Sequence, residues 1–414
     1  MLDIKFIRDN AEQVKTAAKN KKSDPAKVDL AIELDEKRRQ LLTQTEELRS
    51  RRNKLGKDQS EEGKQLKDQL KNLEPELKKV EEQLSITLRQ IPNIPFDDVP
   101  VGKDDTENVV LRKWGTPKKL DFTPKDHVEL GELLGVINVE MAGKISGARF
   151  GYFMGDLALM EMALVQYAFQ KLSQKGFIPV IPPVMIKPEV YIKMARLDPG
   201  QEEERYYMPK DDMYLIGSSE HTLGPLHLDQ VINEKDFPIR YVGFSTCFRR
   251  EAGSYGKDTR GVLRVHQFDK VEMESFTLPE ESRKEQDFLV SLQEELMQDL
   301  NLPYQVVNVC TGDMGGPDAR QIDIETWVPA QNKYRETHSA DLMTDYQSRR
   351  LNTRVKRKSG ETELVHMNDA TYIAIGRTLI AILENYQNAD GSVTIPEVLR
   401  PYMGKDKIEH ANQI

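Results

Sequence analysis

The chain of 414 residues is 38% apolar and 31% charged, which supplies a large core and excludes a single small binding module. No apolar run approaches the roughly 18 residues of a membrane span and the first residues carry no secretory signal, so we expect a soluble, cytoplasmic protein. The net charge of −9 argues against general nucleic-acid binding, and two cysteines exclude a thiolate metal cluster, so any metal must be held by oxygen.

Two leucine-rich helical patterns fill the N-terminal quarter. The first is a series spaced by seven residues: Leu34, Leu41, Leu48 and Leu55. The second runs from Leu66 to Leu84 with the alternating four and three spacing of a coiled-coil stripe. A short polar segment separates them, so the stripes most simply meet in an antiparallel hairpin. Pro75 lies inside the second stripe and is expected to kink it, because proline removes one helical hydrogen bond.

A run of basic residues without an acid lies near the expected tip of this hairpin: Arg49, Arg51, Arg52, Lys54 and Lys57. On charge alone the favoured interpretation is a solvated helix end. A basic tip that projects from the body could instead contact a nucleic-acid backbone, because phosphate contacts need accessible lysine or arginine.

A proline-rich connector from Ile91 to Asn108 predicts a stiff, extended linker that is not a core element. We therefore expect a helical arm with its linker at residues 1–107 and a second domain at residues 108–414. In that domain short β-branched runs alternate with helix-length segments, which predicts an α+β fold. The expected strands are Phe177 to Val180, Ile239 to Phe244 and Gln305 to Val309, and the expected helices are Met154 to Gln174 and Glu281 to Leu300.

The densest group of chemically useful side chains lies between Phe248 and Glu272. A strand, a glycine-containing loop and a return strand would put Arg249 and Glu251 on one face, and Phe268 and Glu272 would point into the same cleft. An arginine fork matches phosphate oxygens, a phenylalanine ring can stack on a purine, and paired acids can hold an amine. A surface hairpin with salt bridges explains any one of these residues, but the combination favours a nucleotide site.

The chain resembles bacterial seryl-tRNA synthetases, a branch of the class II aminoacyl-tRNA synthetases, nearly from end to end. The resemblance begins with Met1 to Asn10 and continues through the hairpin and Ile91 to Pro95 to the segment from Glu397 to Gly404. The segments that look like the three class motifs are Ile181-Pro182-Pro183, Phe248 to Glu272, and Gly376-Arg377-Thr378-Leu379. The resemblance implies a homodimer in which a coiled-coil hairpin precedes a catalytic domain with a mainly antiparallel sheet flanked by helices.

The implied activity is that of a serine-tRNA ligase, which activates L-serine with ATP to seryl-adenylate and transfers it to the terminal ribose hydroxyl of tRNA(Ser). The catalytic arginines implied by the resemblance are Arg249, Arg260 and Arg377. The implied ATP-binding residues are Arg249, Arg250, Glu251, Val265, Phe268, Glu336, Thr337, His338, Ser339 and Arg377. The implied serine-binding residues are Ser218, Ser219, Glu220, Arg249, Glu272 and Thr371. Glu336 and Ser339 match the family's Mg²⁺ pair, and oxygen ligands suit this hard cation. The basic tip would bind tRNA.

The implied amino-acid pocket departs from the family pattern. Asp369 stands where the family has an amide, Tyr372 stands where it has glycine, and Ala340 to Leu342 replace Cys-Ser-Asn. These departures keep open a paralogue that activates another small amino acid or loads a carrier. A non-catalytic tRNA-binding homologue is a further alternative, although the intact set of arginines argues against it.

Overall fold

The computed structural model describes residues 1–55, 60–252 and 261–410. They belong to two compact units, residues 1–95 and residues 96–414, and the boundary lies at Pro95 inside the proline-rich segment. In the described part of the chain no helix is both long and apolar enough to cross a membrane.

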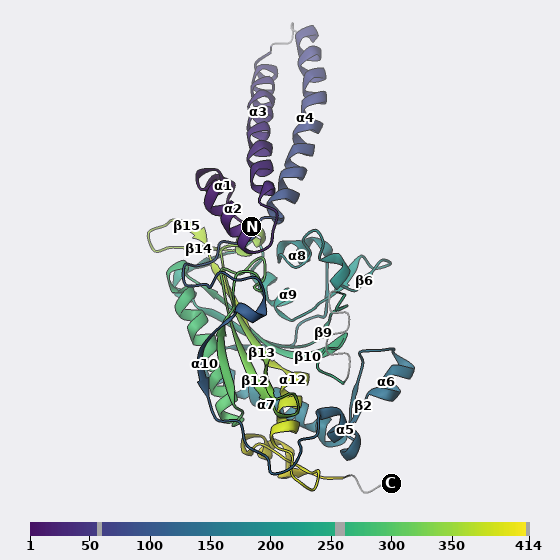
Figure 1. The fold of residues 1–414 in the computed structure, drawn as a ribbon. Helices are drawn as coiled ribbons and strands as arrows, with labels where there is room; N and C mark the ends of the chain where they lie inside the picture. Colours follow the sequence, from purple (N-terminus) through teal and green to yellow (C-terminus); the bar gives the residue numbers. More distant parts are fainter. Residues whose placement is uncertain (56–59, 253–260, 411–414) are drawn as a thin grey trace. The chain divides into compact units, whose positions relative to one another are not determined.

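The N-terminal unit consists of helices. They are α1 (Ile4–Asp9), α2 (Ala11–Asn20), α3 (Ala26–Lys54) and α4 (Ser60–Arg89). The long helices α3 and α4 pack along each other as an antiparallel pair (Figure 1), and Leu41, Leu77 and Val80 are buried between them. The predicted hairpin is confirmed, with α4 continuous through Pro75. Its connecting turn lies outside the described residues.

A large mixed sheet forms the centre of the second unit. Its strands, in spatial order, are β1 (Val109–Trp114), β11 (Tyr304–Asn308), β12 (Arg320–Val328), β13 (Lys333–Thr344), β16 (His366–Ala374), β10 (Gln267–Thr277), β9 (Ile239–Phe248) and β4 (Ile178–Val180). Every pairing is antiparallel except that of β4 with β9, which is parallel. The predicted fold class is therefore confirmed, and the expected strands are found as β4, β9 and β11.

Small strands surround this sheet. They are β2 (Ile137–Asn138) with β3 (Tyr152–Phe153), β5 (Met185–Ile186) with β7 (Met213–Leu215) and β6 (Tyr207–Met208), β8 (Val231–Asn233) with β14 (Arg354–Lys356) and β15 (Thr362–Leu364), and β17 (Val393–Thr394) with β18 (Lys407–Ile408). The helices are α5 (His127–Leu134), α6 (Val139–Ile145), α7 (Gly155–Gln174), α8 (Pro188–Lys193), α9 (Glu220–Leu223), α10 (Ser282–Asp299), α11 (Ser348–Leu351), α12 (Ile375–Asn385) and α13 (Arg400–Met403).

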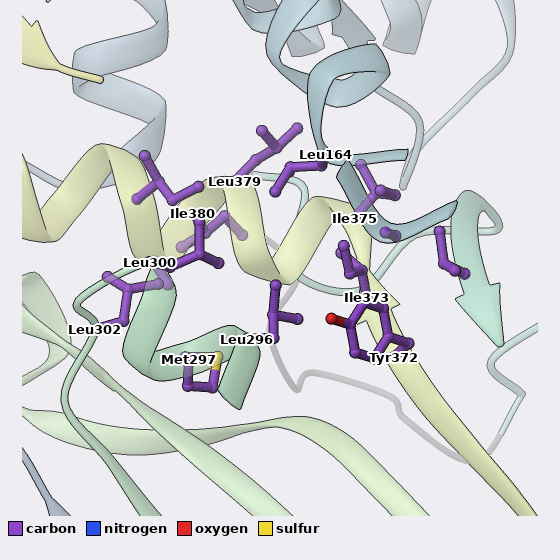
Figure 2. Close-up of a cluster of buried hydrophobic side chains, with 14 of the residues drawn as sticks. Leu164, Leu296, Met297, Leu300, Leu302, Tyr372, Ile373, Ile375, Leu379 and Ile380 are labelled. Atoms are coloured by element: carbon purple, nitrogen blue, oxygen red, sulfur yellow. The ribbon is translucent and has the colours of Figure 1, made fainter. Parts of the chain in front are cut away.

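Helices α7, α10 and α12 cover one face of the sheet and form the main core with it. On α7, Leu157, Met160 and Leu164 recur at helical spacing and are fully buried. Figure 2 shows how Leu296 of α10 and Tyr372 of β16 meet side chains of α7 and α12 in this core. Because successive strand residues point to opposite faces, the other face of the same strands is left for polar side chains.

The prediction that the proline-rich segment is not a core element was wrong for the residues that directly follow Pro95. Val99 is buried with Val309 and Met314, and Phe96 packs against this cluster. The Phe96 N–H also donates a hydrogen bond of 2.9 Å to the carbonyl of Ala319. The apolar side chains between the prolines find partners in the second unit, which an extended linker would have left in water.

Candidate active site

A cavity of about 500 Å³ lies on the polar face of the sheet. Strand β10 contributes Phe268, Lys270 and Glu272, which alternate along the strand and therefore share a face. Strand β16 contributes Asp369 and Thr371 in the same manner. The loop after β9, strand β13 and the first turn of α12 also line it, as do α9, the segment after α8 and the loop between β11 and β12.

The structure brings most of the expected site residues together in this cavity. Those that line it are Glu220, Arg249, Glu251, Val265, Phe268, Glu272, Glu336, Thr337, Ser339, Thr371 and Arg377. Ser218, Ser219, Arg250 and His338 are not among its lining residues. Arg260 lies outside the described residues.

These four residues have identifiable reasons for lying away from the cavity. Ser218 and Ser219 are fully buried: the Ser218 hydroxyl donates to the Glu220 carboxylate, and the Ser219 hydroxyl donates to the carbonyl of Gly243 at 3.4 Å. Arg250 is exposed and lies over the ring of Tyr206. His338 is buried, and its Nδ1 contacts the hydroxyl of Thr337 at 2.8 Å.

Arg249 is fixed at the cavity wall by two contacts. Its Nε donates to the carbonyl of Gly217 at 3.1 Å, and its guanidinium carbon lies 5.3 Å from the centre of the Phe268 ring. Strand β9 ends at Phe248, so Arg249 and Glu251 project from the following loop and not, as expected, from the strand itself. Glu251 has a φ of 52° and forms an ion pair of 2.6 Å with Arg264.

Glu336 and Ser339 reach the cavity because β13 contains a bulge. Residues three apart on a regular strand point to opposite faces. Between β12 and β13 the register shifts, so that Ile324 faces His338 and Glu325 faces Glu336, leaving Thr337 as an extra residue. Because Thr337 is inserted, Glu336 and Ser339 lie on one face of the strand. Arg377 then contacts the Glu336 carboxylate and the Glu336 carbonyl, each at 3.0 Å.

The inner part of the cavity holds a buried network of charges. The Lys270 ammonium contacts the carboxylate of Glu272 and lies 3.6 Å from that of Glu220. Glu220 also contacts Arg196 at 3.5 Å and His221 Nε2 at 3.2 Å. Such groups are stable in a protein interior only when they are paired.

The pKa values of the two acids of this network, Glu220 and Glu272, shift in opposite directions. Burial opposes ionisation of Glu220, but the Lys270 ammonium and the hydrogen bond from His221 outweigh it and hold the Glu220 pKa well below its usual range. Burial outweighs Lys270 at Glu272 and raises the Glu272 pKa to about 7. Burial also lowers the pKa of His221 to about 3, so its ring is neutral. The Gly217 N–H donates to Nδ1 of His221 at 3.1 Å, which leaves Nε2 to donate to Glu220.

Sequence reasoning missed two cations of this network. Lys270 lies between Phe268 and Glu272 in the same alternating pattern, so that pattern alone could have found it. Arg196 follows α8, far from the recognised motifs in sequence, and no local pattern marks it. The described residues contain no group of three or more His, Cys, Asp or Glu side chains that could hold a metal ion.

Comparison with known proteins accords with this geometry. Residues 1–95 match the seryl-tRNA synthetase N-terminal domain, and residues 205–386 match the tRNA synthetase class II core domain (G, H, P, S and T). The chain is 43% identical to a serine-tRNA ligase of Thermotoga petrophila, over 99% of this chain and 100% of that protein. The chain belongs to the seryl-tRNA synthetase family. A serine-tRNA ligase of Thermosipho melanesiensis is 46% identical with the same coverage.

Solved structures of seryl-tRNA synthetases share the fold. The enzyme of Pyrococcus horikoshii complexed with ATP has a TM-score of 0.93 and 37% identity, with 100% of both chains covered. The cytoplasmic enzyme of Naegleria fowleri in complex with AMP has a TM-score of 0.89 and 35% identity, with 100% of this chain and 99% of that chain covered. The resemblance to seryl-tRNA synthetases that the motifs indicated is thus confirmed.

Proposed function

We propose that the chain activates L-serine with ATP to seryl-adenylate and transfers the seryl group to the terminal ribose hydroxyl of tRNA(Ser). One observation carries this proposal: a single cavity of a seryl-tRNA synthetase fold joins a nucleotide end to an amino-acid end. Arg249, Phe268 and Arg377 line the first, and Glu220 and Glu272 line the second.

Adenylate formation needs positioning and charge stabilisation more than a protein nucleophile. The serine carboxylate attacks the α-phosphorus of ATP, and pyrophosphate leaves. Arg249 and Arg377 would stabilise the negative charge on the phosphate oxygens, while the Phe268 ring would stack on adenine. The contact between Arg249 and the Gly217 carbonyl holds the guanidinium at the wall before the nucleotide arrives, so little reorganisation is needed.

The amino-acid end suits an α-amino acid with a hydroxyl group. The Glu220 carboxylate is ionised and buried, so it would bind the α-ammonium of serine. The Thr371 hydroxyl lies at the same wall and 3.5 Å from that of Ser339, where it would exchange a hydrogen bond with the serine hydroxyl. A site that hydrogen-bonds a substrate hydroxyl rejects the analogue that lacks it.

Magnesium is part of the proposal. The Glu336 carboxylate and the Ser339 hydroxyl line one cavity as oxygen donors, and Mg²⁺ is commonly held by one or two protein oxygens together with substrate phosphates. When bound, the ion would neutralise phosphate charge. The ion pair with Arg377 orients the Glu336 carboxylate that would hold the ion.

The helical pair α3 and α4 would hold tRNA through its basic tip. Arg52 and Lys54 are exposed near the end of α3. Arg49 contacts Glu74 at 2.8 Å and Arg51 contacts Glu62 at 3.5 Å, so part of the basic charge is already balanced. Lys57 lies outside the described residues. Lysine and arginine on an exposed helix end favour phosphate contacts, which fix the orientation of a bound nucleic acid without reading its sequence.

A homodimer is also proposed, with its interface at α7 and β4. Leu159 and Met162 on α7 are 54% and 51% exposed, and Ile178 on the contacting strand β4 is 52% exposed. Ile181, in the segment that looks like the first class motif, is 71% exposed. Apolar side chains gathered in this way mark interaction surfaces. The proposed location is the cytoplasm, where ATP and tRNA occur.

Two assays test the proposed function. Serine-dependent exchange of pyrophosphate into ATP measures adenylate formation, and charging of tRNA(Ser) measures transfer. We expect both with serine, and alanine should support far less exchange. Exchange without charging would support the alternative of a carrier-loading paralogue, and tRNA binding without exchange would support the non-catalytic alternative.

A further inference from the structure

A row of three carboxylates lies on adjacent strands, and two of them, Asp369 and Asp341, line the cavity. Asp369 of β16 pairs directly with Glu274 of β10 on one side and with Asp341 of β13 on the other. Directly opposed strand residues share a face, with Cβ atoms roughly 5 Å apart. The proposed serine-binding residues Glu272 and Thr371 lie two positions along the same strands, about 7 Å away.

Among the described residues, the carboxylates of this row outnumber the cations that contact them. Glu274 is fully buried, and neither of its carboxylate oxygens has a hydrogen-bond partner among the described residues. Arg196 contacts Asp369 at 3.3 Å, but the same guanidinium also serves Glu220. Burial and the neighbouring carboxylates raise the pKa of Glu274, Asp369 and Asp341 well above the usual range. A cation placed beside the row would relieve this repulsion.

The cation that fits best is an amine of the substrate. In the part of the chain that the structure describes, no group of acidic, histidine or cysteine side chains is arranged for a metal ion. Asp369 and Asp341 line the same cavity as the proposed serine-binding residues, so a bound amino acid would direct its side chain towards them. An ammonium group there would pair with Asp369 and Asp341, beside the Arg196 guanidinium that Asp369 shares with Glu220.

We propose that this pocket takes short α-amino acids with a second amine on the side chain, such as 2,3-diaminopropionate, in which an amine replaces the hydroxyl of serine. The proposal rests on the proposed adenylating function and extends its substrate class. The chemistry is the same: a carboxylate oxygen of the diamino acid bonds to the α-phosphorus of ATP while the bond from that phosphorus to pyrophosphate breaks.

The test is pyrophosphate exchange by the full chain with serine, alanine, 2,3-diaminopropionate and 2,4-diaminobutyrate. We expect kcat/KM for 2,3-diaminopropionate to lie within tenfold of serine's or above it, with alanine at least a hundredfold below serine. Asp369→Asn and Asp341→Asn should each lower the ratio of diaminopropionate to serine at least tenfold, because each removes a carboxyl group that could ionise and pair with the ammonium, with little change of shape. Glu325→Gln, at a partly buried carboxylate of β12 that is not itself a lining residue of the cavity, should leave that ratio unchanged.

The outcomes separate this inference from the proposed function. If serine supports exchange and diaminopropionate supports it no better than alanine does, the inference is overturned and the proposed function remains. Diaminopropionate exchange without serine exchange supports the inference and overturns serine as the substrate. If no amino acid supports exchange, the proposed function fails, and calorimetric binding decides the inference: tighter binding of diaminopropionate than alanine supports it, and equal binding overturns it. An unchanged ratio in both folded Asp variants also overturns it.

Discussion

Replacement of Arg249 by alanine tests the proposed nucleotide end of the cavity. The change removes a guanidinium aimed into the site and no core volume, since Arg249 is only partly buried. Loss of one preorganised charge-stabilising donor costs about 2.7–4 kcal/mol in the transition state, which is a decrease of 10²- to 10³-fold in kcat. Stability should change less, because the lost contacts are one hydrogen bond to Gly217 and one contact with the Phe268 ring, together about 1–2 kcal/mol.

The assay compares serine-dependent pyrophosphate exchange and thermal unfolding in Arg249→Ala, Arg249→Lys and the neighbouring Arg250→Ala. Arg250 is exposed and does not line the cavity, so its loss should change exchange by less than threefold. Arg249→Lys keeps the positive charge but loses the forked guanidinium, so its exchange activity should lie between those of the parent and of Arg249→Ala. Exchange by Arg249→Ala within threefold of the parent would refute the assigned role. If Arg250→Ala lost more exchange activity than Arg249→Ala, Arg250 and not Arg249 would be the more important arginine.

Four further outcomes are expected. Glu336→Ala should reduce exchange and raise the Mg²⁺ concentration for half-maximal rate, and metal-independent exchange in both proteins would contradict the metal assignment. Deleting residues 28–88 should abolish tRNA charging but spare exchange, whereas loss of both would show that the arm is part of the catalytic fold. Glu272, whose pKa is raised to about 7, becomes neutral as pH falls, so the KM for serine should rise between pH 8 and pH 6. Burial lowers the pKa of His338 from 6.5 to about 4, so the unfolded chain binds more protons than the folded chain between these pH values. About 3 kcal/mol of the free energy of unfolding should therefore be lost as pH falls from 6.5 to 4. Denaturant titrations measure this loss, and His338→Gln should make it smaller.

Local periodicity predicted the arm and several elements of the second unit. The leucine repeat gave α3 and α4 because one apolar stripe on each helix has a single favourable partner, the other helix. The expected helix from Met154 to Gln174 differs from α7 by one residue at its start. These features depend on contacts between residues near in sequence or on a repeated spacing, so they can be recognised in the amino-acid sequence.

Features that depend on tertiary contacts could not be predicted in this way. Arg196 enters the charge network from the segment after α8, and its partners Glu220 and Asp369 lie in α9 and β16. Likewise Ser218 carries the hydroxyl expected of a substrate contact, but its donation to Glu220 makes it a support for the carboxylate. The motifs indicated Ser218 but not Arg196, because the partners of Arg196 follow from the packing of distant segments.

The unusual residues of β16 have different consequences because they face opposite sides of the sheet. Between β10 and β16 the register shifts at Tyr372, a bulge that lets Tyr372 and Ile373 both enter the core beside Leu296 (Figure 2). Tyr372 is fully buried and does not line the cavity, so the ring that replaces a glycine in the family pattern alters core packing and leaves the pocket open. Asp369, on the other face, lines the pocket and adds a carboxylate there. Of these two departures, therefore, only Asp369 can change which amino acid is bound, and the ratio of diaminopropionate to serine measures that change directly.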